Sequence, residues 1–100
     1  MKGLITDLNK AFDNKVRLGV MSVLLTTNES AFNDLKSILE VTDGNLASHL
    51  KALEKEKYIE VVKQFIGRKP NTKYTVTIEG REAFKKHLNA LEGLISAQNT

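Results

Sequence analysis

The feature that most constrains the fold is a double helical pattern in residues 32–53. Two sets of apolar residues recur at helical spacing on either side of a break at Glu40-Val41: Phe32, Leu35, Ile38 and Leu39 before it, and Leu46, Leu50 and Leu53 after it. Each set marks the buried face of a short amphipathic helix. Thr42 or Asp43 is placed to cap the second helix by accepting a hydrogen bond from an unpaired backbone N–H. The pattern therefore predicts a helix-turn-helix.

The outward face of the second predicted helix is small, polar and basic. At about 100° per residue, Gly44, Ser48 and Lys51 fall opposite the leucines, and Asn45 lies at the flank of that arc. The only acid nearby is Asp43. Such a surface can approach a DNA groove closely and hydrogen-bond to base edges and phosphates. The candidate DNA contacts on this segment are Thr42, Gly44, Asn45, Ser48 and Lys51.

A basic hairpin is predicted after the helix-turn-helix, over residues 58–78. The β-branched and aromatic segments 58–63 and 73–78 are typical of strands, and the turn-forming residues 65–72 between them predict a loop. No Asp or Glu occurs from Val61 to Ile78, whereas the stretch holds Lys63, Arg68, Lys69 and Lys73. An acid-free basic loop suits a polyanion. On charge alone, a hairpin that lysines merely keep soluble is equally supported.

The remaining segments are predicted to be helical. Residues 15–26 are apolar almost all round and indicate a central, buried helix that Asp13-Asn14 begins. Ser30-Ala31 is expected to pair briefly as a strand. A short amphipathic helix is predicted within residues 1–13, and Thr77 is expected to cap a longer one that continues to residue 97.

Both terminal helices carry more apolar surface than so small a core can cover. We therefore predict a homodimer held by residues 1–13 and 80–97. The candidate dimerisation residues are Leu4, Leu8, Phe84, Leu88, Leu91, Leu94 and Ile95. The alternative is that the two ends of one chain pair with each other.

Composition restricts the class of protein. One hundred residues are expected to form one domain, 1–100. No apolar run approaches the ~20 residues of a membrane span, and Asp7 comes too early for a signal-peptide core. The chain has no cysteine, which removes disulfides, thiolate metal sites and cysteine nucleophiles. We expect a cytoplasmic protein without a membrane partner.

No catalytic, metal or cofactor site is predicted. Ser48 and His49 are adjacent on a helix, so their side chains diverge and cannot form a nucleophile–base pair. His49 lies at the edge of the leucine face, where a packed, hydrogen-bonded histidine is favoured over a groove contact. His87 has no second ligand near it in sequence, although a cross-subunit pair is conceivable. Gly67 is isolated and forms no phosphate-binding loop. We interpret the chain as a non-enzyme.

The order of these motifs resembles that of MarR- and ArsR-type regulators, in their compact one-domain form. The segment 45–54 followed by 58–61 is similar to their recognition helix and first wing strand. The segment 74–81, with its Thr-x-x-Gly-Arg sequence, is similar to their second wing strand and the entry to the dimerisation helix, and 65–70 resembles their wing. The resemblance covers about residues 14–97.

This resemblance implies a recognition helix in the major groove and a wing on the minor groove or backbone. Carried over by position, it implicates Asn45, Ser48 and Lys51 on the helix and Arg68, Lys69 and Asn71 on the wing. Two departures stand out. The metal-ligand cluster of the metal-sensing members is missing, and small residues at Ala47 and Ala52 predict few base-specific contacts.

Together these observations predict a mainly α protein with a small β-hairpin (α+β), a winged helix-turn-helix with extended terminal helices. The predicted function is sequence-specific binding of double-stranded DNA by a homodimeric transcription regulator. The alternative is a winged-helix module that binds a partner protein and no DNA.

Overall fold

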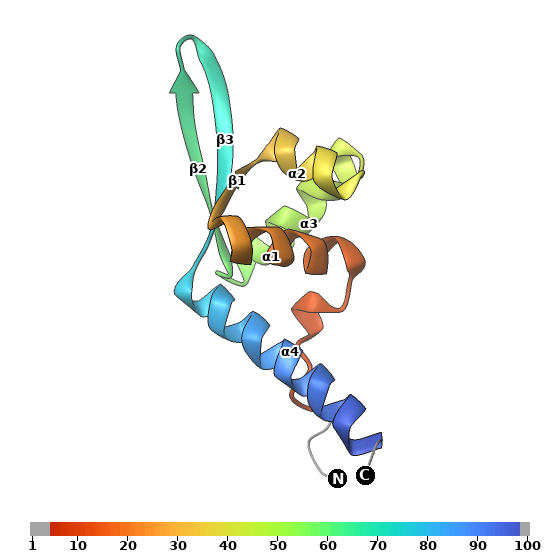
Figure 1. Cartoon of the computed structure of the whole chain (residues 1–100). Coiled ribbons are helices and arrows are strands. Elements are labelled where there is room, and N and C mark those ends of the chain that lie inside the picture. The colour runs from red at the N-terminus through yellow and green to blue at the C-terminus, as the bar shows by residue number, and fades with distance from the viewer. Residues whose placement is uncertain (1–4, 99–100) are drawn as a thin grey trace.

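The computed structural model describes residues 5–98 and has the predicted winged-helix architecture (Figure 1). Its elements are a short 3-10 helix Lys10–Phe12, α1 Lys15–Thr27, β1 Glu29–Ala31, α2 Phe32–Leu39, α3 Asp43–Lys55, β2 Ile59–Ile66, β3 Lys69–Val76 and α4 Ile78–Gln98. The strands form an antiparallel sheet in the order β1-β3-β2. Within the described part of the chain, no helix has both the length and the apolar character that a membrane crossing requires.

Helix α1 is the central element, as its all-round apolar sequence predicts. Asn14 caps it: the side-chain Oδ1 accepts hydrogen bonds from the backbone N–H groups of Val16, at 2.8 Å, and Arg17, at 3.2 Å. Four of its side chains are buried: Val16, Val20, Met21 and Leu24. Helices α2 and α3, the wing and α4 all pack around this core.

The helix-turn-helix is confirmed as α2 and α3. A left-handed backbone at Glu40, with φ of 53°, ends α2. Thr42 then caps α3, since its Oγ1 accepts a hydrogen bond from the N–H of Asn45 at 3.3 Å. Four of the predicted inward positions are fully buried: Leu35, Leu46, Leu50 and Leu53. Phe32 and Leu39 are half-buried, and the prediction is wrong for Ile38 of α2, which is 60% exposed. Because the buried leucines of α3 fix its rotation, its polar arc must face outward.

The wing is longer and more regular than predicted. Ser30-Ala31 does pair as part of β1, but the loop predicted over 65–72 is wrong. Strand β2 continues to Ile66, β3 begins at Lys69, and only Gly67 and Arg68 turn the chain. Gly67 has a φ of +65° and is the first of the two turn residues, the arrangement of a type II′ hairpin.

Pro70 fits this strand because of its register. It lies opposite Phe65, one pair below the Ile66–Lys69 pair that closes the turn. The closing pair of a two-residue hairpin is hydrogen-bonded, so the next pair is not. The N–H that Pro70 lacks would therefore point away from β2, toward an edge that β1 does not cover, since β1 ends opposite Lys73.

The N-terminal segment is not the predicted α-helix. Of residues 1–13, the structure describes 5–13, and these form a turn followed by the 3-10 helix. Tertiary contacts outweigh the helical pattern here. The Asn9 backbone N–H donates to Nδ1 of His87 at 2.9 Å, and Asn9 Nδ2 donates to the Tyr58 hydroxyl at 3.0 Å. Phe12 is fully buried, with its ring 5.1 Å from that of Phe84.

The Thr-x-x-Gly-Arg motif forms the junction between the wing and α4. The Thr77 hydroxyl accepts a hydrogen bond from the N–H of Gly80 at 2.9 Å, which confirms Thr77 as the cap. It also lies 2.7 Å from the carbonyl oxygen of Lys57, to which it donates. Arg81 reaches back to the end of α1, where its guanidinium donates to the carbonyl of Leu25 and the side chain of Asn28. A cation suits that end of a helix.

The molecule is elongated because its two ends extend in opposite directions. Figure 1 shows the hairpin of β2 and β3 rising on one side of α1, while α4 leaves on the other. The principal extents are 58 × 25 × 21 Å. One hydrophobic core includes residues from Phe12 to Phe84, so the elements between them form one folded unit.

Gly80→Ala should strongly destabilise this fold. A Cβ at Gly80 would lie 2.1 Å from the carbonyl oxygen of Tyr58, a backbone atom that cannot move without shifting the wing. We expect the free energy of unfolding to fall by about 3 kcal/mol in urea titrations. Gly93→Ala is the matched control on the same helix, because nothing lies within 4 Å of its Cβ position. It should leave stability unchanged or raise it by up to about 1 kcal/mol. If Gly80→Ala and Gly93→Ala changed stability equally, the close approach of Gly80 to the Tyr58 carbonyl would be contradicted.

Candidate nucleic-acid interface

Helix α3 presents the polar arc that its sequence predicts. Gly44, Asn45, Ser48 and Lys51 are all exposed, on the side opposite the buried leucines. Nothing lies within 4 Å of the Cβ position of Gly44, so a ligand can approach the first turn of the helix closely. Thr42 is also exposed, but its hydroxyl oxygen already accepts the capping hydrogen bond.

The one acid at the start of α3 is paired. Asp43 Oδ1 lies 2.8 Å from Nζ of Lys36, which belongs to α2. The side chains are 42% and 71% exposed, so the pair adds at most about 1 kcal/mol to stability. Its greater effect is on the local charge, because the lysine offsets the one carboxylate that would repel a phosphate at this end of the helix.

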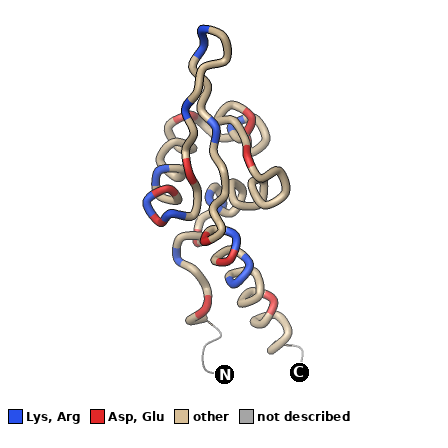
Figure 2. Tube along the Cα trace, turned by 90° about the vertical axis from the view of Figure 1, so that its left-hand side faces the viewer, with Lys and Arg blue, Asp and Glu red and all other residues tan. Residues whose placement is uncertain are grey.

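The wing carries its cations at the tip. Arg68 and Lys69 are exposed there, and Figure 2 shows Lys and Arg but no Asp or Glu along the outer part of the hairpin. Asn71 is half-buried, one strand position further from the tip than Pro70. Arg68 and Lys69 thus provide what a contact with a nucleic-acid backbone requires, a cationic group on a projecting loop.

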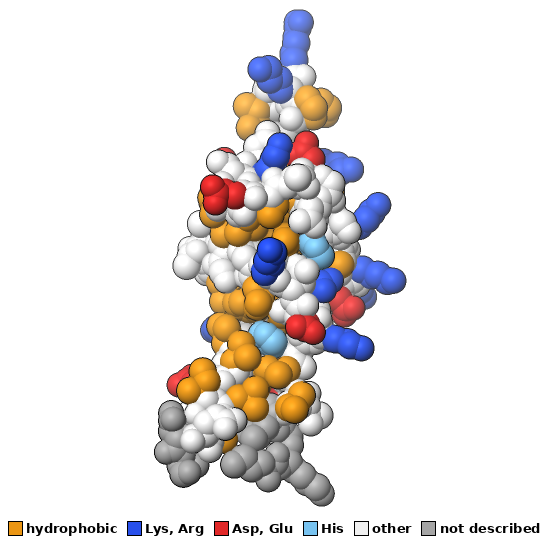
Figure 3. All heavy atoms as spheres, turned by 90° about the vertical axis from the view of Figure 1, so that its right-hand side faces the viewer, with side chains coloured by type: hydrophobic (Ala, Val, Ile, Leu, Met, Phe, Trp, Pro, Cys, Tyr) orange, Lys and Arg blue, Asp and Glu red, His pale blue; other side chains and the backbone are white. Residues whose placement is uncertain are grey.

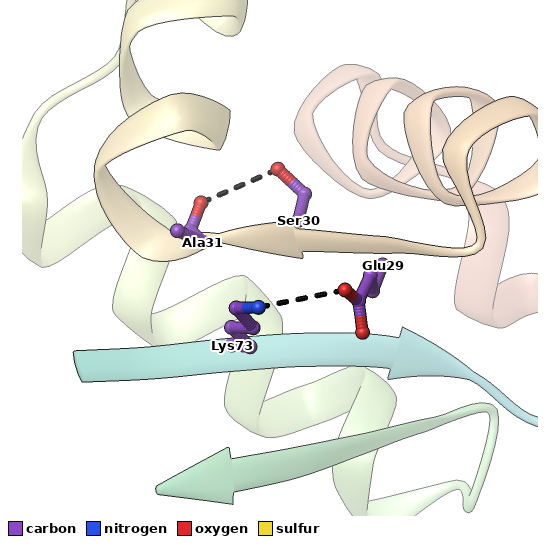
Figure 4. A network of polar contacts seen from close by, with 4 residues as sticks. All are labelled: Glu29, Ser30, Ala31 and Lys73. Atoms are coloured by element: carbon purple, nitrogen blue, oxygen red, sulfur yellow. Dashed lines mark hydrogen bonds and ion pairs between the residues drawn. The ribbon is translucent and has the colours of Figure 1, made fainter. Parts of the chain in front are cut away.

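Lys73 is placed differently from the other predicted wing residues. It lies at the base of the wing, where Ala31 of β1 is its neighbour. Its Nζ is 3.5 Å from Oε1 of Glu29, so its charge is partly matched within the chain (Figure 4). Arg68 and Lys69 are therefore the stronger candidates for a phosphate contact.

The structure places α3 and the wing on the same side of the molecule. In Figure 1, the α2–α3 pair and the hairpin both lie on one side of α1, and the far end of α4 lies on the other. The wing and the α2–α3 pair are therefore both separated from the far end of α4. Neither element could be placed relative to the other from the sequence.

The predicted dimerisation residues divide into two groups. Phe84 is only 3% exposed and packs against Phe12 within the core, so its prediction as an interface residue is wrong. Leu8 and Leu94 are half-buried, and Leu4 lies outside the described residues. The remaining three are exposed: Leu88 by 42%, Leu91 by 38% and Ile95 by 64%.

The two histidines have different surroundings. His87 is buried, and its Nδ1 accepts the hydrogen bond from Asn9, which commits that nitrogen within the chain. His49, on α3, is half-buried, in agreement with a packed position. Burial lowers the pKa of His49, and the positive charge of Arg17 on α1 lowers it further. No group of three or more metal-ligating side chains occurs within residues 5–98.

Two exposed apolar residues of the wing were not identified as functional from the sequence. Phe65 and Ile66 sit in the segment predicted to be a loop, yet they belong to β2 and flank the turn. The signal was present: equal strand-like runs on both sides of Gly67-Arg68, with glycine in the first turn position, are typical of a two-residue hairpin.

Comparisons with known proteins agree with this geometry. Residues 16–95 match the family described as "Winged helix DNA-binding domain". The chain is 38% identical over 79 residues to an uncharacterised protein of Methanocaldococcus jannaschii, covering 79% of this chain and 86% of that protein. The structure of a transcriptional regulator homologue from Pyrococcus horikoshii superimposes with a TM-score of 0.89 and 31% identity, covering 100% of both chains.

A regulator of the MarR family from Enterococcus faecalis shares the fold at lower identity. It has a TM-score of 0.69 and 23% identity, covering 96% of this chain and 84% of that one. The family match spans most of the sequence, and the protein therefore belongs to the winged-helix DNA-binding domains. It is a DNA-binding protein and not an enzyme.

The depressed pKa of His49 should make stability depend on pH. Below about pH 6.5 the unfolded chain binds a proton at this position more readily than the folded protein, so stability falls as the pH drops through the folded-state pKa. His49→Gln should remove this part of the acid sensitivity, in urea titrations at about pH 7.5 and about pH 5. Asn45→Ala, one turn away on α3, should keep the wild-type dependence. If the stability of His49→Gln fell between the two pH values as much as that of the wild type, His49 would not be the source of this acid sensitivity.

Proposed function

We propose that the protein is a homodimeric transcription regulator that binds double-stranded DNA sequence-specifically. Helix α3 lies in the major groove, and the wing tip contacts the backbone or the minor groove. The observation that carries the proposal is the combination, on one side of the molecule, of an exposed polar face on α3 and a cationic wing whose outer part, beyond Glu60, has no acid. A regulator of this kind acts where the chromosome lies, which in a cell without a nucleus is the cytoplasm.

Base reading is assigned to the first turns of α3. The amide of Asn45 can bond an adenine in two places, and Lys51 can reach a guanine or a phosphate. Ser48 lies between them, and its hydroxyl accepts several partners. Gly44 and Ala47 are exposed and small, which lets the helix backbone approach the groove floor.

Dimerisation is assigned to the far half of α4. The helix has 21 residues, but its buried positions, Gly80, Phe84 and His87, all lie in the first half. Beyond them, Leu88, Leu91 and Ile95 remain exposed at one-turn spacing. Exposed apolar side chains in a row are typical of a helix that packs against another. A second copy of α4 would cover them.

A groove next to α4 extends this apolar surface. It has a volume of about 630 Å³ and runs between the N-terminal segment and α4. Its lining includes Ile5, Leu8, Phe12, Leu18 and Leu91. Figure 3 shows hydrophobic side chains gathered over this part of the molecule. Because Leu91 belongs to both surfaces, a partner subunit on α4 would also border the groove.

The DNA proposal is tested by separating base reading from phosphate binding. Once a preferred site has been selected from random fragments, we expect an inverted repeat with half-sites about 10 base pairs apart, or a small multiple of that. Asn45→Ala should cost about 1–3 kcal/mol at that site and much less on random duplex. Equal losses on both DNAs would show that Asn45 only positions the protein.

The paired wing variant should behave in the opposite way. Arg68→Ala with Lys69→Ala should weaken binding to both DNAs by a similar factor, because phosphate contacts carry no base information. The log–log salt dependence should flatten by about one unit per lost contact in each subunit. A wild-type protein that binds neither DNA at low salt would instead support the protein-interaction alternative.

The dimer should dissociate when charge is placed on the exposed row of α4. Leu91→Glu with Ile95→Glu should give monomers in sedimentation equilibrium, because two buried carboxylates would face their copies. Asn89→Glu with Ser96→Glu adds the same charge to exposed polar positions of the same helix half and should remain dimeric. A wild-type protein that is monomeric at micromolar concentrations would rule out this interface.

A further inference from the structure

The wing tip exposes apolar side chains that a phosphate contact does not use. Phe65 is 74% exposed and Ile66 is 63% exposed, and both are next to the cationic turn. Removing such groups from water is favourable, so leaving a phenylalanine and an isoleucine at the end of a projecting hairpin has a cost. A wing that only held phosphates would need Arg68 and Lys69 but neither of these residues.

The two side chains lie on opposite faces of the hairpin. Successive residues of a strand alternate between faces, so Phe65 shares one face with its cross-strand partner Pro70. Ile66 shares the other face with Val62, which is also exposed. Figure 3 shows hydrophobic side chains on both sides of the hairpin, below the Lys and Arg at its end. A surface for docking a flat partner would be apolar on one face only.

The tip stands clear of the protein body. The last pair that β3 shares with β1 is Lys73 with Ala31, and four further residue pairs separate it from the turn. At ~3.3 Å per residue, these four pairs extend the hairpin by roughly 13 Å. The end of the wing therefore projects, along the strand direction, well beyond the part of the sheet that packs against the core.

The minor groove of DNA is narrower than this hairpin is thick. The minor groove of B-form DNA is about 6 Å wide. A strand pair with side chains on both faces is about as thick as the ~10 Å spacing of packed sheets. A two-faced hairpin can therefore enter the minor groove only if the groove widens, and apolar side chains that enter it often unstack a base step.

We propose that the wing tip is an apolar wedge that opens the minor groove. Phe65 and Ile66 contact the sugar walls and a partly unstacked base step, while Arg68 and Lys69 hold the flanking phosphates. This inference rests on the proposed DNA-binding function and deepens it. It makes the wing a reader of DNA deformability, since pyrimidine–purine steps such as TA open easily and A-tracts resist opening.

Charge identifies DNA as the occupant. Lys63, Arg68 and Lys69 surround the apolar pair, and no acid occurs between Val61 and Ile78. A second copy of the wing would bring like charges together, whereas a polyanion satisfies the cations and shelters the apolar groups at once. The wing and α3 lie on the same side of α1, so both can meet one duplex (Figure 1).

The test compares two duplexes of equal length and equal A·T content, each closed by the same G·C clamps. One alternates A and T and so is rich in TA steps; the other is an A-tract. A wing that used cations alone would prefer the A-tract, because its narrow minor groove has the more negative potential. A wedge prefers the alternating duplex. The measured quantity is the affinity for the alternating duplex divided by the affinity for the A-tract, both at the same salt concentration.

Phe65→Thr with Ile66→Thr should lower that ratio by about five- to tenfold and leave the salt dependence unchanged, because the cations remain. Threonine keeps the strand propensity of both positions, and circular dichroism checks the fold. The control is Ile78→Ala, which removes an equally exposed apolar side chain, 74% exposed, from the start of α4. It should keep the wild-type ratio.

The possible failures are distinguishable. A wild-type protein that binds neither duplex would overturn the DNA-binding function and the wedge together. Wild-type binding with the same ratio in the wing variant would overturn the wedge alone. A variant that kept the ratio but lost self-association in sedimentation would show that Phe65 and Ile66 are protein contacts, which also overturns the wedge.

Discussion

The arrangement of the whole molecule depends on the contacts around Tyr58, between the end of α3 and the wing. Its carbonyl oxygen accepts a hydrogen bond from the backbone N–H of Thr77, at 3.0 Å, and lies 3.1 Å from the Thr77 hydroxyl oxygen. Its backbone also fills the space that a side chain at Gly80 would need. Its ring packs 5.3 Å from Phe12, and its hydroxyl binds Asn9. Helix α3, the wing, α4 and the N-terminal segment therefore meet at one residue.

This junction explains why the two projecting parts of the protein can be poorly covered and still be held in place. The wing tip and the far half of α4 bury little, but each begins at a well-packed base. Their exposed apolar residues cost stability in the monomer and become useful only on contact with something else. For α4 the proposed contact is a second subunit, and for the wing it is DNA. The two contacts lie at opposite ends of the molecule, so neither excludes the other.

The sequence predicted the elements well wherever local signals and burial agree. The leucines of α3, the cap at Asn14 and the cap at Thr77 all came from short-range patterns, and the core uses them as predicted. Prediction failed where long-range contacts override the local pattern. The N-terminal segment has helical periodicity, yet hydrogen bonds from Asn9 to His87 and Tyr58 hold it as a turn and a 3-10 helix. Composition suggested a wide loop in the wing, where the strand register leaves only two turn residues.

The sequence by itself determined the helix-turn-helix, the identity of its outward residues and the absence of acids from residues 61–78 of the wing, because these follow from spacing and side-chain type alone. Only the tertiary structure decided that Lys36 pairs with Asp43, that Lys73 pairs with Glu29 and that Phe84 belongs to the core. It also decided that Phe65 and Ile66 lie on opposite faces of an extended hairpin. Each of these depends on which residues meet across elements, and the packing of the whole chain sets those distances, not the sequence neighbours of any one residue.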